Sequence, residues 1–104
     1  MAFKNTLRDS AVRTVIFREG DAYLGAALEF NIVESGDTPQ EVMLLLDDAV
    51  KGYVESARKR KLSIGVLNQE VEPAYEALWQ SAREGRGGAK VYSASSQPLA
   101  ALAA

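Results

Sequence analysis

The sequence contains neither cysteine nor histidine in its 104 residues. Without cysteine, the chain can form no disulfide framework and no thiolate metal site. Without histidine, it lacks the commonest ligand of zinc and copper and the side chain that most often acts as a general base near neutral pH. We therefore expect no metal, no cofactor and no catalytic residue, and we interpret the protein as a non-enzyme.

Long apolar runs and a strong excess of one charge are also missing. The net charge is −2 and the pI is near 5.1, so the overall field gives no reason to expect a nucleic acid as the main partner. No stretch of about 18 apolar residues occurs, and the first ten residues contain no apolar segment of signal-peptide length. These features predict a cytoplasmic protein with no membrane contact.

The size and apolar content of the chain are those of one small domain. Apolar residues make up 47% of the composition, which is ordinary for a folded chain with a single core. Residues 93–104 are rich in small side chains and have no core pattern, so we expect them to form a mobile tail. The prediction is one α+β domain over residues 1–92 and a tail over 93–104.

Three short strands are expected in the first third of the chain. Ala11–Arg18 is rich in β-branched residues, and the sequence Glu-Gly-Asp at 19–21 offers a tight reversal. The next run, 22–30, is apolar almost throughout, and 31–35 makes a third candidate strand. The pattern is typical of an antiparallel meander.

A long helix is expected to begin immediately after the third strand. Thr38 is suited to the N-cap position, Pro39 to the first helical position, and Glu41 to closing a capping box. Gly36 allows the chain to turn just before it. At about 100° per residue, the apolar face expected to cover the sheet consists of Val42, Leu45, Leu46, Ala49, Val50, Tyr53 and Ala57.

Leu44 does not follow this amphipathic pattern. It falls among charged positions, with Met43 and Val54 on its flank, so an apolar strip is expected on the outer surface of the helix. Isolated surface leucines are also common in proteins without a partner. The sequence leaves both readings open, a plain surface residue and a partner contact.

The second half of the chain is expected to complete the fold. Alternation over residues 62–67 favours a fourth strand, and a loop is the alternative. A second helix is expected from about Gln69, with Pro73 in its first turn and Gly85 as its stop, and 89–94 is a candidate short strand. The predicted fold class is α+β, an antiparallel sheet of three to four strands packed against one long helix, with an additional C-terminal helix.

Carboxylates are the remaining groups that could carry chemistry. Their placement on a solvent face or at a helix start argues against a metal site, since catalytic ions require acids that converge in a cleft. A carboxylate-dependent nuclease is the weakest of the three functional readings. The carboxylates considered are those of Asp21, Glu29, Glu34, Asp37, Asp47 and Asp48.

The basic run Arg58–Lys61 is expected to complement the negative end of the long helix, with phosphate contact as the alternative.

Residues 15–58 carry a resemblance to a known family. A strand, an acidic-glycine turn, a strand beginning at Tyr23, and the segment Gly-Asp-Thr-Pro-Gln-Glu-Val at 36–42 leading into a helix resemble the HicB-like family of bacterial antitoxins and their solitary relatives. The resemblance implies a three-stranded meander on one long helix, often with a further strand, in a partial ribonuclease H-like fold. It also implies a cytoplasmic homo-oligomer and, for true antitoxins, a complex that masks the active site of a small ribonuclease toxin.

The sequence departs from the family pattern at two places. Where the family has aspartate, leucine, proline and glycine between its second and third strands, this chain has Glu29, Phe30, Asn31 and Ile32. The C-terminal DNA-binding module of many such antitoxins has no recognisable counterpart here, so DNA binding is not expected. We predict an antitoxin-type binding protein, with a stand-alone homo-oligomeric structural or ligand-binding domain as the alternative. The predicted partner-binding residues are Glu29, Phe30, Asn31, Ile32 and Leu44.

Overall fold

The computed structural model describes residues 11–60, 64–85 and 90–98. A meander comes first, formed by β1 (Ala11–Glu19), β2 (Ala22–Ala27) and β3 (Ile32–Gly36). The long helix α1 (Pro39–Lys59) follows, and then a shorter helix, α2 (Pro73–Arg83), and a last strand, β4 (Val91–Pro98). Two 3-10 helices, η1 (Leu28–Phe30) and η2 (Ile64–Leu67), connect these elements. The α+β fold class predicted from the sequence is confirmed.

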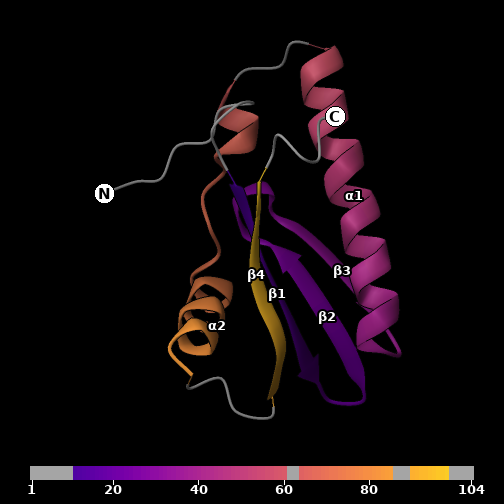
Figure 1. Cartoon of the computed structure of the whole chain (residues 1–104), viewed down its shortest axis with the longest axis vertical. Helices are drawn as coiled ribbons and strands as arrows, with labels where there is room; N and C mark the ends of the chain where they lie inside the picture. Colours follow the sequence, from indigo (N-terminus) through magenta and orange to yellow (C-terminus); the bar gives the residue numbers. More distant parts are fainter. Residues whose placement is uncertain (1–10, 61–63, 86–89, 99–104) are drawn as a thin grey trace.

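The four strands form one antiparallel sheet in the order β3-β2-β1-β4. The last strand therefore pairs with the first, and β1 lies in the interior of the sheet (Figure 1). The β1–β2 hairpin turns at Gly20, whose φ of 62° is in the left-handed region that glycine adopts without strain. The two edges of the sheet are β3 and β4.

Helix α1 covers one face of the sheet, over β2 and β3 (Figure 1). Its N-terminus follows the sequence prediction, since Thr38 Oγ1 accepts a hydrogen bond from the Glu41 amide at 3.1 Å. The Glu41 carboxylate accepts from the Asp37 amide, one residue before the position that a standard capping box uses. The buried residues of α1 are Val42, Leu46, Val50, Val54 and Ala57.

Helix α2 lies against the opposite face, over β1 and β4 (Figure 1). Because β1 alternates its side chains, Val12 joins the cluster under α1, whereas Val15 and Phe17 join the cluster under α2. The result is a three-layer arrangement in which each helix covers about half of its face. The second helix has Pro73 in its first turn and ends before Gly85, as the sequence predicts, but it begins at Pro73 and not near Gln69.

Four other predictions about this fold need correction. Leu45 is 41% exposed and Val54 is fully buried, so the apolar face of α1 is rotated relative to the expected one. The expected fourth strand at 62–67 is the 3-10 helix η2 over residues 64–67, with 61–63 outside the described residues. The second strand ends at Ala27, and 28–30 form η1. Residues 93–98, expected in the tail, form most of β4, whereas 99–104 lie outside the described residues.

Among the described residues, neither α1 nor α2 combines the length and the apolar character that a membrane-spanning helix requires.

Candidate functional site

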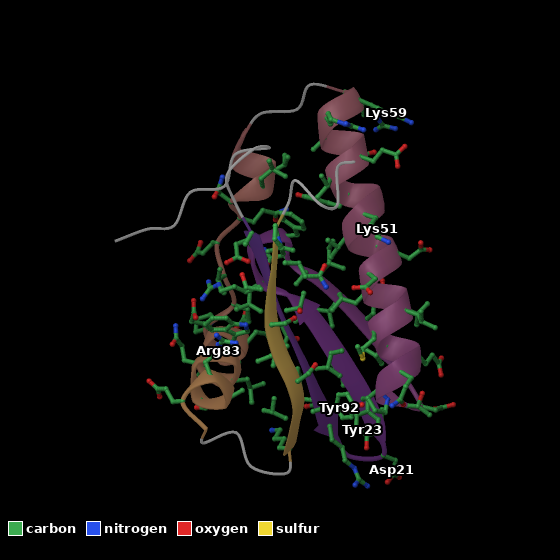
Figure 2. The ribbon with its side chains drawn as sticks, in the orientation of Figure 1. Asp21, Tyr23, Lys51, Lys59, Arg83 and Tyr92 are labelled. Atoms are coloured by element: carbon green, nitrogen blue, oxygen red, sulfur yellow. The ribbon has the colours of Figure 1, made fainter. Side chains whose placement is uncertain are left out.

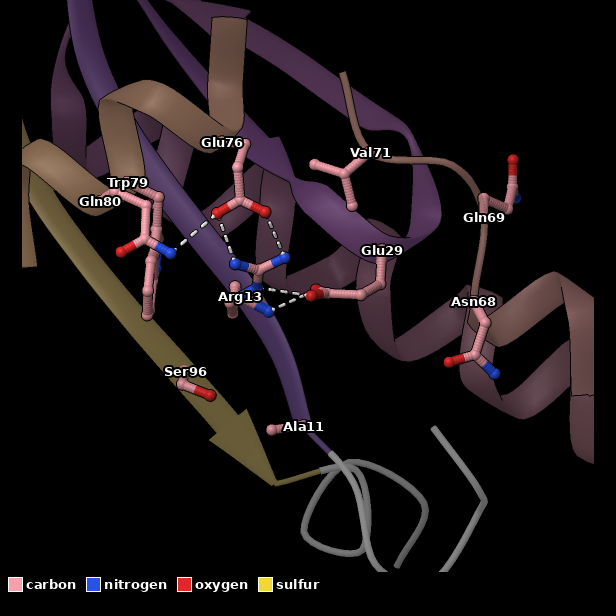
Figure 3. Close-up of a pocket in the computed structure, with 10 residues that line it drawn as sticks. All are labelled: Ala11, Arg13, Glu29, Asn68, Gln69, Val71, Glu76, Trp79, Gln80 and Ser96. Atoms are coloured by element: carbon pink, nitrogen blue, oxygen red, sulfur yellow. Dashed lines mark hydrogen bonds and ion pairs between the residues drawn. The ribbon is translucent and has the colours of Figure 1, made fainter. Parts of the chain in front are cut away.

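A cluster of charged side chains surrounds Arg13, near the start of strand β1. Its Nε donates to Glu29 Oε2 at 2.6 Å, and its backbone amide donates to Glu29 Oε1 at 2.8 Å. Its two terminal nitrogens donate to the two oxygens of Glu76, at 2.6 and 2.9 Å (Figure 3). One guanidinium therefore joins η1, which carries Glu29, to α2, which carries Glu76.

The charges of this cluster stabilise one another. Burial by itself lowers the pKa of Arg13, but its hydrogen bonds to Glu76 and Glu29 outweigh that effect, so the pKa is raised. The hydrogen bond from Arg13 is the main cause that lowers the pKa of Glu76, and it outweighs the partial burial of that carboxyl. Both groups are therefore held in their charged forms across the neutral range, and neither is poised to exchange a proton near pH 7.

Trp79 of α2 forms the wall of this cluster beside β4. Its indole Nε1 donates to the backbone oxygen of Ser95 at 3.0 Å, which ties α2 to the last strand. The guanidinium carbons of Arg13 and Arg83 lie 5.1 and 5.6 Å from the ring centroid, within the range of a cation–π interaction. Trp79 thus acts in the described structure as an anchor between helix and strand.

A cavity of about 620 Å³ opens beside the Arg13 cluster (Figure 3). Its size falls in the range of small-molecule pockets. Its charged groups, however, already satisfy one another, and the described residues contain no group of three acids or other ligands that could hold a metal ion. We therefore interpret it as a structural cleft. Its lining residues are Ala11, Arg13, Glu29, Asn68, Gln69, Val71, Glu76, Trp79, Gln80 and Ser96.

The structure places the predicted partner-binding residues in different environments. Glu29 is 3% exposed and Phe30 is 2% exposed, so their side chains serve the interior of the fold and present no surface to a partner. Asn31 is exposed, with a φ of 54°, and Ile32 is half-buried against the core. Leu44 is 73% exposed on α1. The five residues therefore do not form one continuous surface.

The edge of β3 presents an apolar surface that the sequence interpretation missed. Val33 is 43% exposed on β3. Gln40 and Asp47 of α1 hydrogen-bond to Tyr92 and Gln97 of β4, which identifies the flank of α1 that faces β4. Tyr92 is labelled in Figure 2. At about 100° per residue, Leu45 lies on the opposite flank, toward β3. Exposed Val33 and Leu45 therefore border the β3 edge from its two sides.

The Arg13 cluster also escaped the sequence interpretation. Its two ion pairs join residues 16 and 63 positions apart, and no local pattern reports such pairs. A signal was nevertheless present, since Arg13 and Glu29 are single charges within apolar runs that read as buried strands. Charged residues at buried positions are almost always paired, so these two were candidates for partners.

Comparison of the chain with protein-family models, with curated proteins and with solved structures finds no match.

Proposed function

We propose that this protein acts by stoichiometric binding, as a HicB-like antitoxin that masks the active site of a small ribonuclease. The proposal is supported by the resemblance over residues 15–58 together with the arrangement it implies, a meander β1-β2-β3 on one long helix with a further strand. Masking requires shape and hydrogen bonds, and the polar cluster around Arg13 offers no unpaired acid or base for a reaction. The protein is then a non-enzyme of the cytoplasm, where its target acts.

The β3 edge is the binding surface that we assign to this function. An extended segment of the ribonuclease would add a strand beside Ile32–Gly36, a mode in which backbone hydrogen bonds supply affinity and flanking pockets supply specificity. Val33 and Leu45 would provide the flanking apolar contacts. Asn31 and Ile32 begin this edge and remain part of the predicted interface, whereas Glu29 and Phe30 hold it in place from inside.

The test uses the short basic protein that the proposal expects to be encoded beside this gene. Purified neighbour protein is assayed for RNA cleavage while this chain is titrated in, and cleavage is expected to cease near a 1:1 ratio. Val33→Lys places a charge on the β3 edge and is expected to weaken inhibition about tenfold or more. Leu44→Lys adds the same charge on the part of α1 farthest from the sheet and is expected to leave inhibition unchanged.

Two results would overturn the proposal. A neighbour-encoded protein that cleaves RNA equally well with excess chain present would remove the antitoxin role. Equal loss of inhibition by Val33→Lys and Leu44→Lys, with both variants folded, would remove the assignment to the β3 edge.

A second candidate function is a stand-alone domain that assembles with itself and has no toxin. The observation in its favour is the other edge of the sheet, β4, whose eight residues carry no charge. Ribonuclease inhibition separates the two candidates, since a stand-alone domain has no effect on RNA cleavage.

A further inference from the structure

Strand β4 is an edge strand without the usual protection against pairing. Its sequence, Val-Tyr-Ser-Ala-Ser-Ser-Gln-Pro, contains no charged residue, and its proline is the last position. Within the described residues, β4 pairs with β1 on one side and with nothing on the other. Natural edge strands are commonly short, or carry lysine, inward charges or an internal proline that discourages a second chain. An uncharged edge of eight residues is therefore suited to receive another strand.

The hydrogen bond between the Arg13 amide and Glu29 indicates which residues of β4 direct their backbone groups toward the free edge. The Arg13 amide donates to Glu29, just past the end of β2, so Arg13 directs its backbone toward the β2 side. Successive residues of a strand alternate sides, so Thr14 directs its backbone toward β4 and bonds inward with Ser95, its register partner. Ala94 and Ser96 consequently direct their N–H and C=O groups outward.

We propose that two copies of this chain pair through their β4 edges, antiparallel, with a two-fold axis at Ser95. In this register Ala94 of one copy lies opposite Ser96 of the second copy, and the reverse holds by symmetry. Each such pair exchanges two backbone hydrogen bonds, because both residues direct their groups outward. The two sheets become one continuous eight-stranded sheet, and the side chains that meet at its centre, those of Ala94, Ser95 and Ser96, are small.

The position of α2 fits this pairing. The helix lies over β1 and β4, so its axis is about half a strand spacing inside β4, and strands are about 4.8 Å apart. The two-fold axis lies another half spacing outside β4. The α2 helices of the two copies are then about 10 Å apart, a distance at which helices pack side by side without a gap or a clash.

Trp79 lies beside the proposed two-fold axis. Its indole nitrogen hydrogen-bonds to Ser95, the residue on the axis. Aromatic side chains are enriched at the centres of protein interfaces, and Trp79 of each copy would lie near this centre. Glu76 takes no part in the contact, because both of its oxygens already bind Arg13 on the side of β1.

The inference is tested by sedimentation of the full chain over a micromolar concentration series. A reversible monomer–dimer equilibrium is expected. Hydrogen exchange at the two ends of the series provides the second readout, with the Ala94 and Ser96 amides exchanging slowly in concentrated samples and rapidly in dilute ones. A monomer throughout the series, or rapid exchange of both amides when concentrated, overturns the proposal.

A matched pair of proline variants identifies the edge. Ser96→Pro removes an outward N–H from β4 and is expected to weaken the dimer about tenfold or more. The loss is doubled because both copies carry the substitution and each loses one hydrogen bond. Val33→Pro removes an outward N–H from the opposite edge, β3, and is expected to leave dimerisation unchanged. A folded Ser96→Pro variant that dimerises as tightly as the parent chain overturns the proposal.

A foreign strand is the competing occupant of this edge. If the chain stays monomeric and the Ala94 and Ser96 amides become protected only when the neighbour-encoded protein is added, β4 receives another protein and self-pairing is refuted. The dimer does not depend on the antitoxin role, because that role is assigned to β3. A failure of ribonuclease inhibition therefore leaves this test intact, and a monomeric chain leaves the inhibition test intact.

Discussion

The two helices cover opposite faces of one sheet but are held there in different ways. Helix α1 inserts a stripe of buried side chains, among them Leu46, Val50 and Val54, into the main apolar cluster. None of the described residues Pro73–Arg83 of α2 is fully buried. Instead, α2 is joined to the sheet by directional bonds, from Arg13 to Glu76 and from Trp79 to Ser95, over half-buried apolar contacts.

This difference indicates different responses to perturbation. Apolar burial is non-directional and cooperative, so loss of any part of the α1 stripe weakens the whole fold. Charge-assisted bonds are strong at one geometry and are lost together when the helix moves away. We therefore interpret α1 and the meander as the stable platform and α2 as a cover that can open before the platform unfolds.

Truncation of leucine side chains is expected to give the largest difference in stability between the contact of α1 with the sheet and that of α2. Leu46→Ala removes a buried side chain under α1 and is expected to lower the free energy of unfolding by about 2–5 kcal/mol. Leu78→Ala, in the half-buried contact under α2, is expected to cost less than half as much. Leu44→Ala at the exposed surface is the control, with a change within about 0.5 kcal/mol. Urea unfolding measures all three, and equal costs for Leu46 and Leu78 would contradict the comparison.

The close approach of α1 to β2 gives the next largest effect. A Cβ on Gly25 would lie 2.6 Å from Val42 Cγ1 and 3.2 Å from Leu46 Cδ2, so Gly25→Ala forces the helix side chains to move. The expected loss is about 1–3 kcal/mol. Gly52→Ala is the control, because a Cβ there meets nothing within 4 Å and alanine favours a helix by about 1 kcal/mol. A neutral Gly25→Ala would show that α1 is not seated tightly on the sheet.

The Arg13 cluster is tested by neutral isosteres. Glu29→Gln keeps the shape but removes the charge from a carboxyl that is 3% exposed, and the expected loss is about 1–3 kcal/mol. The side chain of Glu76 is 36% exposed, so solvent screens its pair with Arg13, and Glu76→Gln is expected to cost less. Chemical denaturation ranks the two variants, and the reverse order would show that the cluster is anchored at α2.

The smallest effect is a dependence of stability on pH. Arg13 holds the pKa of Glu76 below its ordinary value of 4.5, so this carboxyl contributes stability that is fully present above that value. The contribution is lost as pH falls through the lowered pKa in the folded chain. The melting temperature of the parent chain should therefore fall more steeply below pH 4.5 than that of Glu76→Gln. Parallel curves would contradict the role given to this pair.

The elements that the sequence predicted correctly are those whose signals are local. The Thr38 cap, the Gly20 turn and the place of Pro73 in the first turn of α2 each depend on a few neighbouring residues, and all three occur as expected. The phase of α1 was wrong because it depends on a distant partner. Val54 is buried in the same cluster as Leu67, which lies in the segment that was expected to be a strand.

The candidate site was harder to predict from the sequence than the fold, because it is formed by residues far apart in the chain. The first half of β4 lies in the predicted short strand at 89–94, but its second half is rich in small polar residues typical of a tail, and its pairing with β1 extends the strand to Pro98. The contacts of Arg13 required α2 and η1 to meet at the interior strand, a juxtaposition that no periodicity reports. Of the predicted partner-binding residues, Glu29 and Phe30 were predicted from their place in the family resemblance, between the second and third strands, whereas η1 buries both side chains.

Native-state hydrogen exchange in low urea tests the central claim most directly, since it measures the opening of each helix separately. The amides of Val50 and Val54 in α1 are expected to exchange only through global unfolding, with a strong urea dependence. Those of Leu78 and Trp79 in α2 are expected to exchange through a smaller opening of lower free energy, and Glu76→Gln should lower it further. A single opening free energy shared by both helices would contradict the account of a platform and a cover.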